Sequence, residues 1–187
     1  FNENVKSTEI TEVDNIYVKA ILNESEIAHS VAYATNASHP AKTESHIDLN
    51  SQSFTIEMWI KYSSAGTILT HGTADNKFVI AVDDNACLNI TVNDKSMKSL
   101  KTLPKDKWTY LAVAVNQGSD FATLSAVCAY DEFEDNLFVD ETAPLYKGNG
   151  VITVGEGLEA EIHELTLWNY ARTSSESLSD IYLTKSP

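Results

Sequence analysis

The sequence has little of several residues that mark large classes of protein. Only two cysteines, seven glycines and four prolines occur in 187 residues. So few cysteines exclude a disulfide-dense domain, and so little glycine and proline exclude collagen-like and low-complexity chains. No stretch approaches the roughly 18 apolar residues that a membrane-spanning helix needs. The remaining composition, 43% hydrophobic and 21% charged, is typical of a globular protein.

Positive charge is also scarce. Thirteen Lys and Arg side chains stand against 27 Asp and Glu side chains, which gives a formal net charge of -14. A surface of that sign repels phosphate backbones and anionic lipid headgroups. We therefore expect no nucleic-acid partner and no membrane insertion, whereas cation binding has to be considered.

Alternating polarity is the dominant pattern from residue 54 onward. In the run SFTIEMWIKY, residues 54, 56, 58 and 60 are apolar, which is the period of a strand with one buried face. Similar runs span 67–72, 78–82, 87–92, 95–103, 108–116, 121–130, 151–156 and 161–171, and we expect the last two to pair. So many short strands predict an all-β fold, a two-sheet antiparallel β-sandwich.

Two further features complete the predicted architecture. Thr173 with Glu176 three residues later forms a capping-box pattern, which predicts one short C-terminal helix. Residues 1–30 are acidic and polar around one apolar run, and we interpret them as an N-terminal arm or first strand. Residues 31–187 are the predicted sandwich domain. The chain begins at Phe1 without a leader, and we interpret it as a processed chain or part of a longer one.

The order of these runs resembles a known family. The phrases FTIEMWIK, GTILTHG, FVIAVDDNACLNITV, LPKDKWTYLAVAVN, VITVGEG and EAEIHELTLWNYA follow one another as in the laminin-G-like jelly rolls of the concanavalin A-like lectin/glucanase superfamily. The resemblance covers residues 45 to 183, and Trp59, Trp108, Gly155 and Trp168 fall inside the matching phrases. It implies a concanavalin A-like jelly-roll sandwich.

Two stretches depart from the family pattern. AYDEFEDNLFVD lacks the glycine-bearing turn of many members, so we expect a longer or differently shaped hairpin there. In the closing phrase His163 replaces an acid. Both departures reduce what the resemblance implies about ligands.

Three carboxylates near the C-terminus raise the question of catalysis. Glu159, Glu161 and Glu164 have the spacing of the catalytic strand that the resemblance implies for retaining glucanases of the superfamily. Retaining chemistry needs two carboxyl groups about 5–5.5 Å apart. On a regular strand Glu164 points away from the other two, so only a bulge between Ile162 and Glu164 would bring all three together.

The family alignment implies a plainer interpretation of the same strand. There Ile162, Glu164, Thr166 and Trp168 alternate with their neighbours along an ordinary strand, and the acid at Glu164 takes no part in hydrolysis. His163 is then a half-exposed strand residue, although a general base or metal ligand is the alternative. We expect no catalytic residues.

Calcium is the metal to consider, because laminin-G-like domains often hold one ion on an edge loop. Asp83 and Asp84 offer oxygen ligands in one turn, and hard cations need several oxygens at short range. The alternative is a solvated hairpin tip whose residues suit the turn.

Aromatic residues divide into two groups. The three tryptophans lie in strand phrases and are expected to pack in the interior. Phe133, Phe138 and Tyr146 lie in the stretch that departs from the family, and they are the candidate contact residues for a glycan or protein ligand.

The resemblance implies a non-catalytic recognition or adhesion module. It would be secreted or displayed at the cell surface, as part of a longer protein, and would bind carbohydrate or another extracellular protein. No other catalytic or nucleotide-binding motif occurs in the chain. Two alternatives stay open: a glycoside hydrolase that uses Glu159 as nucleophile and Glu164 as acid/base, and a purely structural spacer domain.

Overall fold

A computed structural model describes residues 33–35 and 40–181 of the protein. The interpretation of residues 1–30 as an arm or first strand lies outside the described residues. The elements in chain order are β1 (Tyr33–Thr35), β2 (Ala41–Lys42), β3 (Ile47–Asp48), β4 (Phe54–Tyr62), β5 (Gly66–Gly72), β6 (Lys77–Val82), β7 (Cys87–Val92), β8 (Lys95–Thr102), β9 (Thr109–Gln117), β10 (Ala122–Tyr130), β11 (Phe133–Ala143), β12 (Asn149–Gly150), β13 (Ile152–Val154), β14 (Ala160–Trp168) and α1 (Ser174–Asp180).

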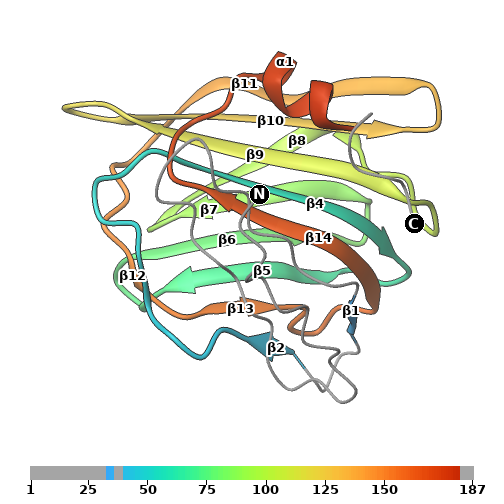
Figure 1. Ribbon diagram of the computed structural model, residues 1–187, viewed down its shortest axis with the longest axis horizontal. Helices are drawn as coiled ribbons and strands as arrows, with labels where there is room; N and C mark the ends of the chain where they lie inside the picture. Colours follow the sequence, from blue (N-terminus) through green and yellow to red (C-terminus); the bar gives the residue numbers. More distant parts are fainter. Residues whose placement is uncertain (1–32, 36–39, 182–187) are drawn as a thin grey trace, which may run out of the picture.

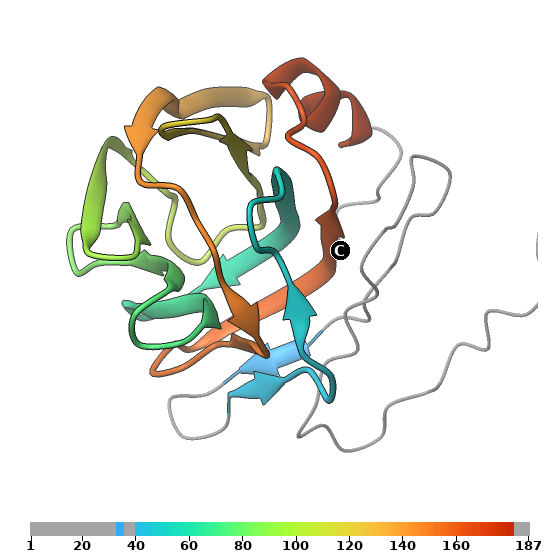
Figure 2. The same cartoon turned by 90° about the vertical axis from the view of Figure 1, so that its left-hand side faces the viewer.

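Two antiparallel six-stranded sheets face each other (Figure 1). The front sheet has the order β1-β14-β4-β9-β10-β11, and the back sheet has the order β2-β13-β5-β6-β7-β8. Seen along the strands in Figure 2, they form the two layers of a sandwich. The predicted all-β jelly-roll sandwich is therefore confirmed.

The expected pairing of the last two strands is wrong. β13 pairs with β2 and β5 in the back sheet, whereas β14 pairs with β1 and β4 in the front sheet. The link between them crosses from one sheet to the other, and Gly155 and Gly157 in it take φ angles of 81° and 69°. Left-handed backbone of this kind is what glycine adopts without steric cost.

Alternating side chains fill the space between the sheets, as the polarity pattern predicts. In β4, Phe54, Ile56, Met58 and Ile60 are each at most 1% exposed. Leu111, Val113 and Val115 of β9 and their partners from the back sheet complete one continuous core. Cys128 lies in this core, and both cysteines of the chain are free thiols.

A second layer of burial covers the outer face of the front sheet. Trp59, Tyr110 and Val127 form a separate cluster there, against which Leu178 of α1 packs. Trp168 is 5% exposed on the same face. The tryptophans of β4 and β14 are thus interior residues, but they pack beneath the C-terminal segment rather than between the sheets.

The helix begins as its capping box predicts. The backbone N–H of Glu176 donates to the Thr173 side chain, and the Glu176 carboxylate accepts the N–H of Thr173 at 2.7 Å. Two otherwise unpaired backbone donors are satisfied in this way. No helix among the described residues has the length and apolar character to cross a membrane.

The β10–β11 hairpin is tighter than the missing glycine suggested. Tyr130 pairs directly with Phe133, so the turn consists of Asp131 and Glu132 alone. Asp131 takes a φ of 52°, a left-handed conformation that Asp tolerates better than most residues. Of the two alternatives, a longer or a differently shaped hairpin, the longer one is wrong, because Asp131 adopts the left-handed conformation for which a glycine is usually needed.

β8 is an outer strand of the back sheet and carries three lysines. Lys98 forms an ion pair of 2.7 Å with Asp83. Lys95 donates to the carbonyl oxygen of Thr142, and Lys101 pairs with Asp135, both on β11. These contacts tie the outer strands of the two sheets together along one side of the sandwich.

A buried histidine closes one end of the core. His71 is 2% exposed, and its Nε2 lies 2.8 Å from the carbonyl oxygen of Ile47. Its Nδ1 lies 2.7 Å from the Tyr146 hydroxyl. Because a carbonyl oxygen only accepts, Nε2 carries the proton. The Tyr146 hydroxyl also donates to the backbone carbonyl oxygen of His71 at 3.0 Å. Burial lowers the pKa of His71, and hydrogen bonds to the backbone oppose that shift.

We expect this histidine to make stability depend on pH. Its pKa in the folded protein lies below that of an unfolded histidine, about 6.5. The unfolded state therefore binds more protons as the pH falls below about 6.5, and the free energy of unfolding decreases by at most ~1.4 kcal/mol per pH unit from this residue. Urea unfolding between about pH 7.5 and 5.5 measures the slope.

Matched variants isolate the contribution of His71. The His71→Gln variant should be less stable at every pH and should have a shallower slope than the parent protein. His46 is exposed, and its charge makes only a minor contribution to the lowered pKa of His71, so His46→Gln should change the slope much less than His71→Gln does. Equal slopes in all three proteins would contradict the buried neutral state of His71.

Candidate functional site

β14 contains a bulge at the carboxylates that the sequence singles out. His163 pairs with Trp59 and Thr166 pairs with Glu57, so Glu164 and Leu165 together oppose a single residue of β4. Glu164 has a φ of 52°. The plainer expectation, in which Glu164 alternates with its neighbours along an ordinary strand, is wrong. The extra residue resets the alternation, so that Leu165 lies in the core.

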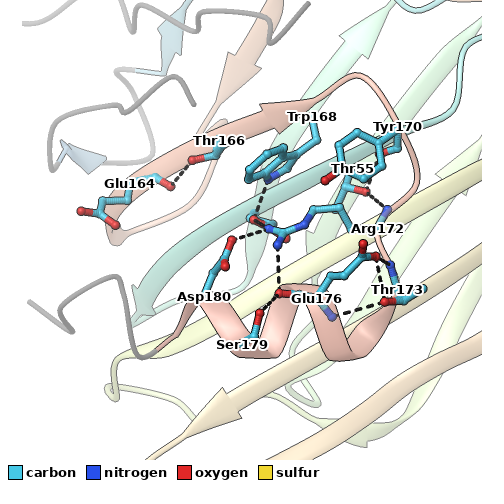
Figure 3. A network of polar contacts seen from close by, with 11 residues as sticks. Thr55, Glu164, Thr166, Trp168, Tyr170, Arg172, Thr173, Glu176, Ser179 and Asp180 are labelled. Atoms are coloured by element: carbon cyan, nitrogen blue, oxygen red, sulfur yellow. Dashed lines mark hydrogen bonds and ion pairs between the residues drawn. The ribbon is translucent and has the colours of Figure 1, made fainter. Parts of the chain in front are cut away.

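The three carboxylates lie in different surroundings. Glu161 is half exposed and forms an ion pair of 2.6 Å with Lys61. Glu159 is exposed in the link before β14, where its backbone N–H donates to Ser64. Glu164 points away from Arg172 in Figure 3, and its Oε2 is buried without a hydrogen-bond partner. The bulge supplies the kink that catalysis would require, but an ammonium group neutralises the middle carboxylate.

His163 lies next to this bulge. It is half-buried, and its Nδ1 is buried without a hydrogen-bond partner. In the described part of the chain, no group of three or more His, Cys, Asp and Glu side chains is placed to hold a metal ion. His163 thus has no metal-ligand set around it.

The predicted aromatic contact residues separate into exposed and buried ones. Phe133 is 64% exposed at the tip of the β10–β11 hairpin, where its ring centroid lies 5.8 Å from that of Tyr130. Phe138 is 6% exposed, and Tyr146 is fully buried between Phe54 and His71. Tyr146 is therefore wrong as a surface contact, because its side chain is fully buried in the core, and Phe138 keeps only a small exposed edge.

The turn suggested for calcium is held by protein donors. Asp83 accepts hydrogen bonds from the backbone N–H groups of Asn85 and Cys87 and from the Asn89 side chain. The ion pair with Lys98 and these hydrogen bonds hold the pKa of Asp83 well below its usual range. Asp84 is exposed beside it. The conformation of this turn is thus explained by its own hydrogen bonds.

The sequence did not reveal a buried ionic cluster on the outer face of the front sheet (Figure 3). Nη1 of Arg172 lies 2.8 Å from both carboxylate oxygens of Glu57 and 2.6 Å from Asp180. Its Nη2 donates to the carbonyl oxygen of Glu176, and the guanidinium stacks 4.2 Å from the Trp168 ring centroid. Trp168 also donates its indole N–H to Glu57 at 2.7 Å.

This cluster fixes the path of the chain after β14. Thr55 donates to the carbonyl oxygen of Tyr170 and accepts the backbone N–H of Arg172 at 2.8 Å. Burial raises the pKa of Glu57, while its contacts with Ser177, Arg172 and Trp168 oppose that rise. The sequence contains one hint of this cluster: Arg172 is the single arginine among the 13 basic residues.

A groove of about 370 Å³ lies beside the Arg172 cluster, on the outer face of the front sheet. Strands β9, β10 and β11 form one part of it, and residues 171–174 form the other. Its lining residues are Ala114, Asn116, Thr123, Ser125, Asn136, Phe138, Val139, Asp140, Ala171, Arg172, Thr173 and Ser174. Most of these side chains carry hydroxyl or amide groups or are small and apolar.

An irregular stretch of β11 shapes this groove. The pairing of β10 with β11 shifts register twice, between Leu124 and Val127. Opposite this stretch, Asp140 takes a φ of 47°. The Ser125 hydroxyl donates to Asp140 Oδ1 and accepts the backbone N–H of Asp140, each at 3.1 Å. A bulge re-aims side chains in this way, and Ser125 holds it in place.

Comparisons with known proteins identify the family. Residues 35–176 match a laminin G family of the concanavalin A-like lectin/glucanases superfamily. The chain belongs to this family. The predicted laminin-G-like resemblance is therefore confirmed, and the match includes the bulged β14 and the Arg172 segment. None of the curated proteins matches the chain in sequence.

Solved structures share the laminin-G-like fold at low identity. A SAP-like pentraxin from Limulus polyphemus aligns with a TM-score of 0.54 and 13% identity over 80% of both chains. The binding domain of Paraclostridial mosquitocidal protein 1 aligns with a TM-score of 0.57 and 15% identity over 91% of this chain. The binding domain of botulinum neurotoxin serotype G gives 0.50 and 9% over 87%. This chain spans about half of each toxin domain, 48% and 47%.

The left-handed backbone at Glu164 leads to a prediction about stability. An L-residue in this conformation is destabilised by about 1–2 kcal/mol, and glycine is not. We expect Glu164→Gly to be more stable than Glu164→Ala by about 1 kcal/mol in urea unfolding. At Glu161, in the regular part of β14, the order should reverse. Greater stability of alanine at both positions would contradict the bulge.

The buried ion pair leads to a second prediction. Arg172→Met leaves the Glu57 carboxylate buried without its counter-charge and should decrease the free energy of unfolding by about 3–5 kcal/mol. Adding Glu57→Gln should restore part of the loss, because the uncompensated charge is then absent. Lys61→Met, at the more exposed pair with Glu161, should cost less than about 1 kcal/mol. Similar losses for Arg172→Met and Lys61→Met would refute the buried pairing.

Proposed function

We propose that this protein is a non-catalytic recognition module that binds a glycan or an extracellular protein. The observation that carries the proposal is the groove on the outer face of the front sheet. It is open, formed on three strands, and lined by polar side chains that converge from separate elements. Sites of this kind bind ligands without rearrangement of the scaffold.

Structural relatives support recognition as the role. Two of the similar structures are themselves described as binding domains, those of botulinum neurotoxin serotype G and mosquitocidal protein 1. Because this chain spans about half of each of them, we propose that it works as one domain of a longer protein. We further propose that it is secreted or displayed at a cell surface, with a role in adhesion.

The surroundings of the carboxylates argue against hydrolysis. Retaining glycosidases need one ionised and one protonated carboxyl group facing each other across the scissile bond. Here Glu161 is paired with Lys61, and Glu159 is exposed in a loop. Glu164 lies at a bulge beside the half-buried His163. The three carboxylates thus differ in their surroundings, and the middle one is already paired with an ammonium group.

We also propose that calcium contributes to binding through the turn at Asp83 and Asp84. A cation at Asp83 and Asp84 would have to displace the Lys98 ammonium from Asp83. The exposed Asp84 carboxylate would then supply a second ligand. Binding assays with calcium and with a chelator decide whether the ion contributes.

The proposal predicts glycan retention without cleavage. We expect the protein to bind at least one class of saccharide on a glycan array and to release no reducing sugar from β-glucans. Glu159→Gln and Glu164→Gln should bind as the parent protein does. Sugar release by the parent that either substitution abolishes, with folding intact, would overturn the proposal in favour of a glycoside hydrolase. A protein that binds neither glycans nor extracellular proteins would be a structural spacer.

A further inference from the structure

We propose that the groove between β11 and residues 171–174 binds an uncharged saccharide unit. Asn136 and Asp140 contact its hydroxyl groups, and Val139 contacts its apolar face. This inference rests on the proposed recognition function and assigns it a site and a ligand chemistry.

The size of the groove fits a small polar ligand. Its volume of about 370 Å³ lies at the lower end of the ~300–1,000 Å³ that is typical of small-molecule sites. It therefore accommodates about one or two monosaccharide units. The small side chains of Ala114 and Ser125 on neighbouring strands leave this space open above the sheet.

The polar side chains provide both kinds of hydrogen-bonding group that a sugar hydroxyl needs. Asp140 is exposed, and its carboxylate has about four lone-pair sites, of which Ser125 occupies one. The amides of Asn116 and Asn136 are also exposed and offer donors. A hydroxyl that donates to Asp140 and accepts from an amide is satisfied on both sides.

The bulge in β11 aims these groups at the ligand. Asp140 holds a left-handed φ of 47°, a conformation that Asp adopts more readily than most residues other than glycine. Ser125 stabilises the conformation from β10 with two hydrogen bonds. A regular strand at this position would not present Val139 and Asp140 side by side.

Apolar contact comes from the same strand. Val139 is 64% exposed and lines the groove together with the nearly buried Phe138. A sugar ring has C–H groups on its faces, and their removal from water onto such side chains is favourable.

The charges around the groove select against acidic ligands. Arg172 is the only cationic side chain in its lining, and Glu57 and Asp180 already neutralise it. Asp140 is an exposed carboxylate, and the chain carries a net charge of -14. A sialylated or sulfated sugar would meet repulsion without a free counter-charge.

Arg172 forms part of the groove wall but offers the ligand no accessible free charge. Its side chain is 6% exposed, and its Nε is buried without a hydrogen-bond partner. Of the residues that line the groove, it is the one with such an atom. Buried donors are nearly always paired, so we expect an ordered water enclosed beside Arg172 to accept from this N–H.

The test begins with the intact protein on an array of neutral, sialylated and sulfated glycans. The strongest neutral binder is then titrated by calorimetry against the parent protein and three variants. Asn136→Ala and Asp140→Gly should each weaken binding at least about tenfold. Glycine suits the φ of residue 140, so Asp140→Gly removes the carboxylate without disturbing the backbone.

The control makes the same change elsewhere. Asp106 also has a positive φ, 58°, and lies before the first residue of β9, whereas the groove contacts the other end of that strand. Asp106→Gly should bind as the parent does. Thermal unfolding of each variant verifies that it is folded.

The outcomes separate this inference from the proposed function. Loss of binding in Asn136→Ala and Asp140→Gly, with Asp106→Gly unaffected, supports both. Parent-like binding by all three variants would overturn the groove as the site and leave recognition intact. Preference for sialylated or sulfated glycans would overturn the uncharged ligand. Absence of binding to every glycan would overturn this inference and the carbohydrate part of the proposed function together.

Discussion

The carboxylate of Glu57 imposes the constraint on which the outer layer of the molecule depends. It lies in the middle of β4, 4% exposed, on the face of the front sheet that would otherwise meet solvent. A buried charge without a partner is strongly destabilising, so the chain has to supply a cation and hydrogen-bond donors. Arg172 and Trp168 supply them. The segment after β14 and helix α1 are thereby held over the sheet, and that segment forms one wall of the groove.

The sequence predicted the parts of the fold that arise from local pattern. Alternation in residues 54–60 corresponds to a strand with one face in the core, and the capping box at Thr173 corresponds to the start of α1. The pairing of strands could not be predicted in the same way, because the residues of a run such as 151–156 do not indicate which strand lies next to it. A bulge near Glu164 could be named from the sequence only as a possibility. Its left-handed backbone occurs at a glutamate, a residue that does not favour this conformation, so no local pattern predicted it.

The candidate site was harder to predict for a related reason. Its lining comes from residues 114–140 and 171–174, which only the tertiary fold brings together. Phe138 and Tyr146 look like loop aromatics in sequence, and yet both are buried, because β11 and the chain after it pack against the core. Asp83 and Asp84 look like a cation site, and yet lysine and backbone donors satisfy Asp83. The sequence shows which side chains could bind a ligand or a cation, but only the fold shows which of them already have partners within the protein.

The lysines of β8 have a consequence for behaviour at high concentration. An outermost strand leaves unpaired backbone groups on which another copy of the chain can add a strand, and this is a common route to aggregation. The side chains of Lys95 and Lys101 reach from β8 to β11. Their ammonium groups therefore lie on the side of the sandwich where another strand would be added. A second copy would have to break these contacts and bury ammonium groups. The lysines of β8 thus oppose the addition of a further strand at this edge of the sandwich.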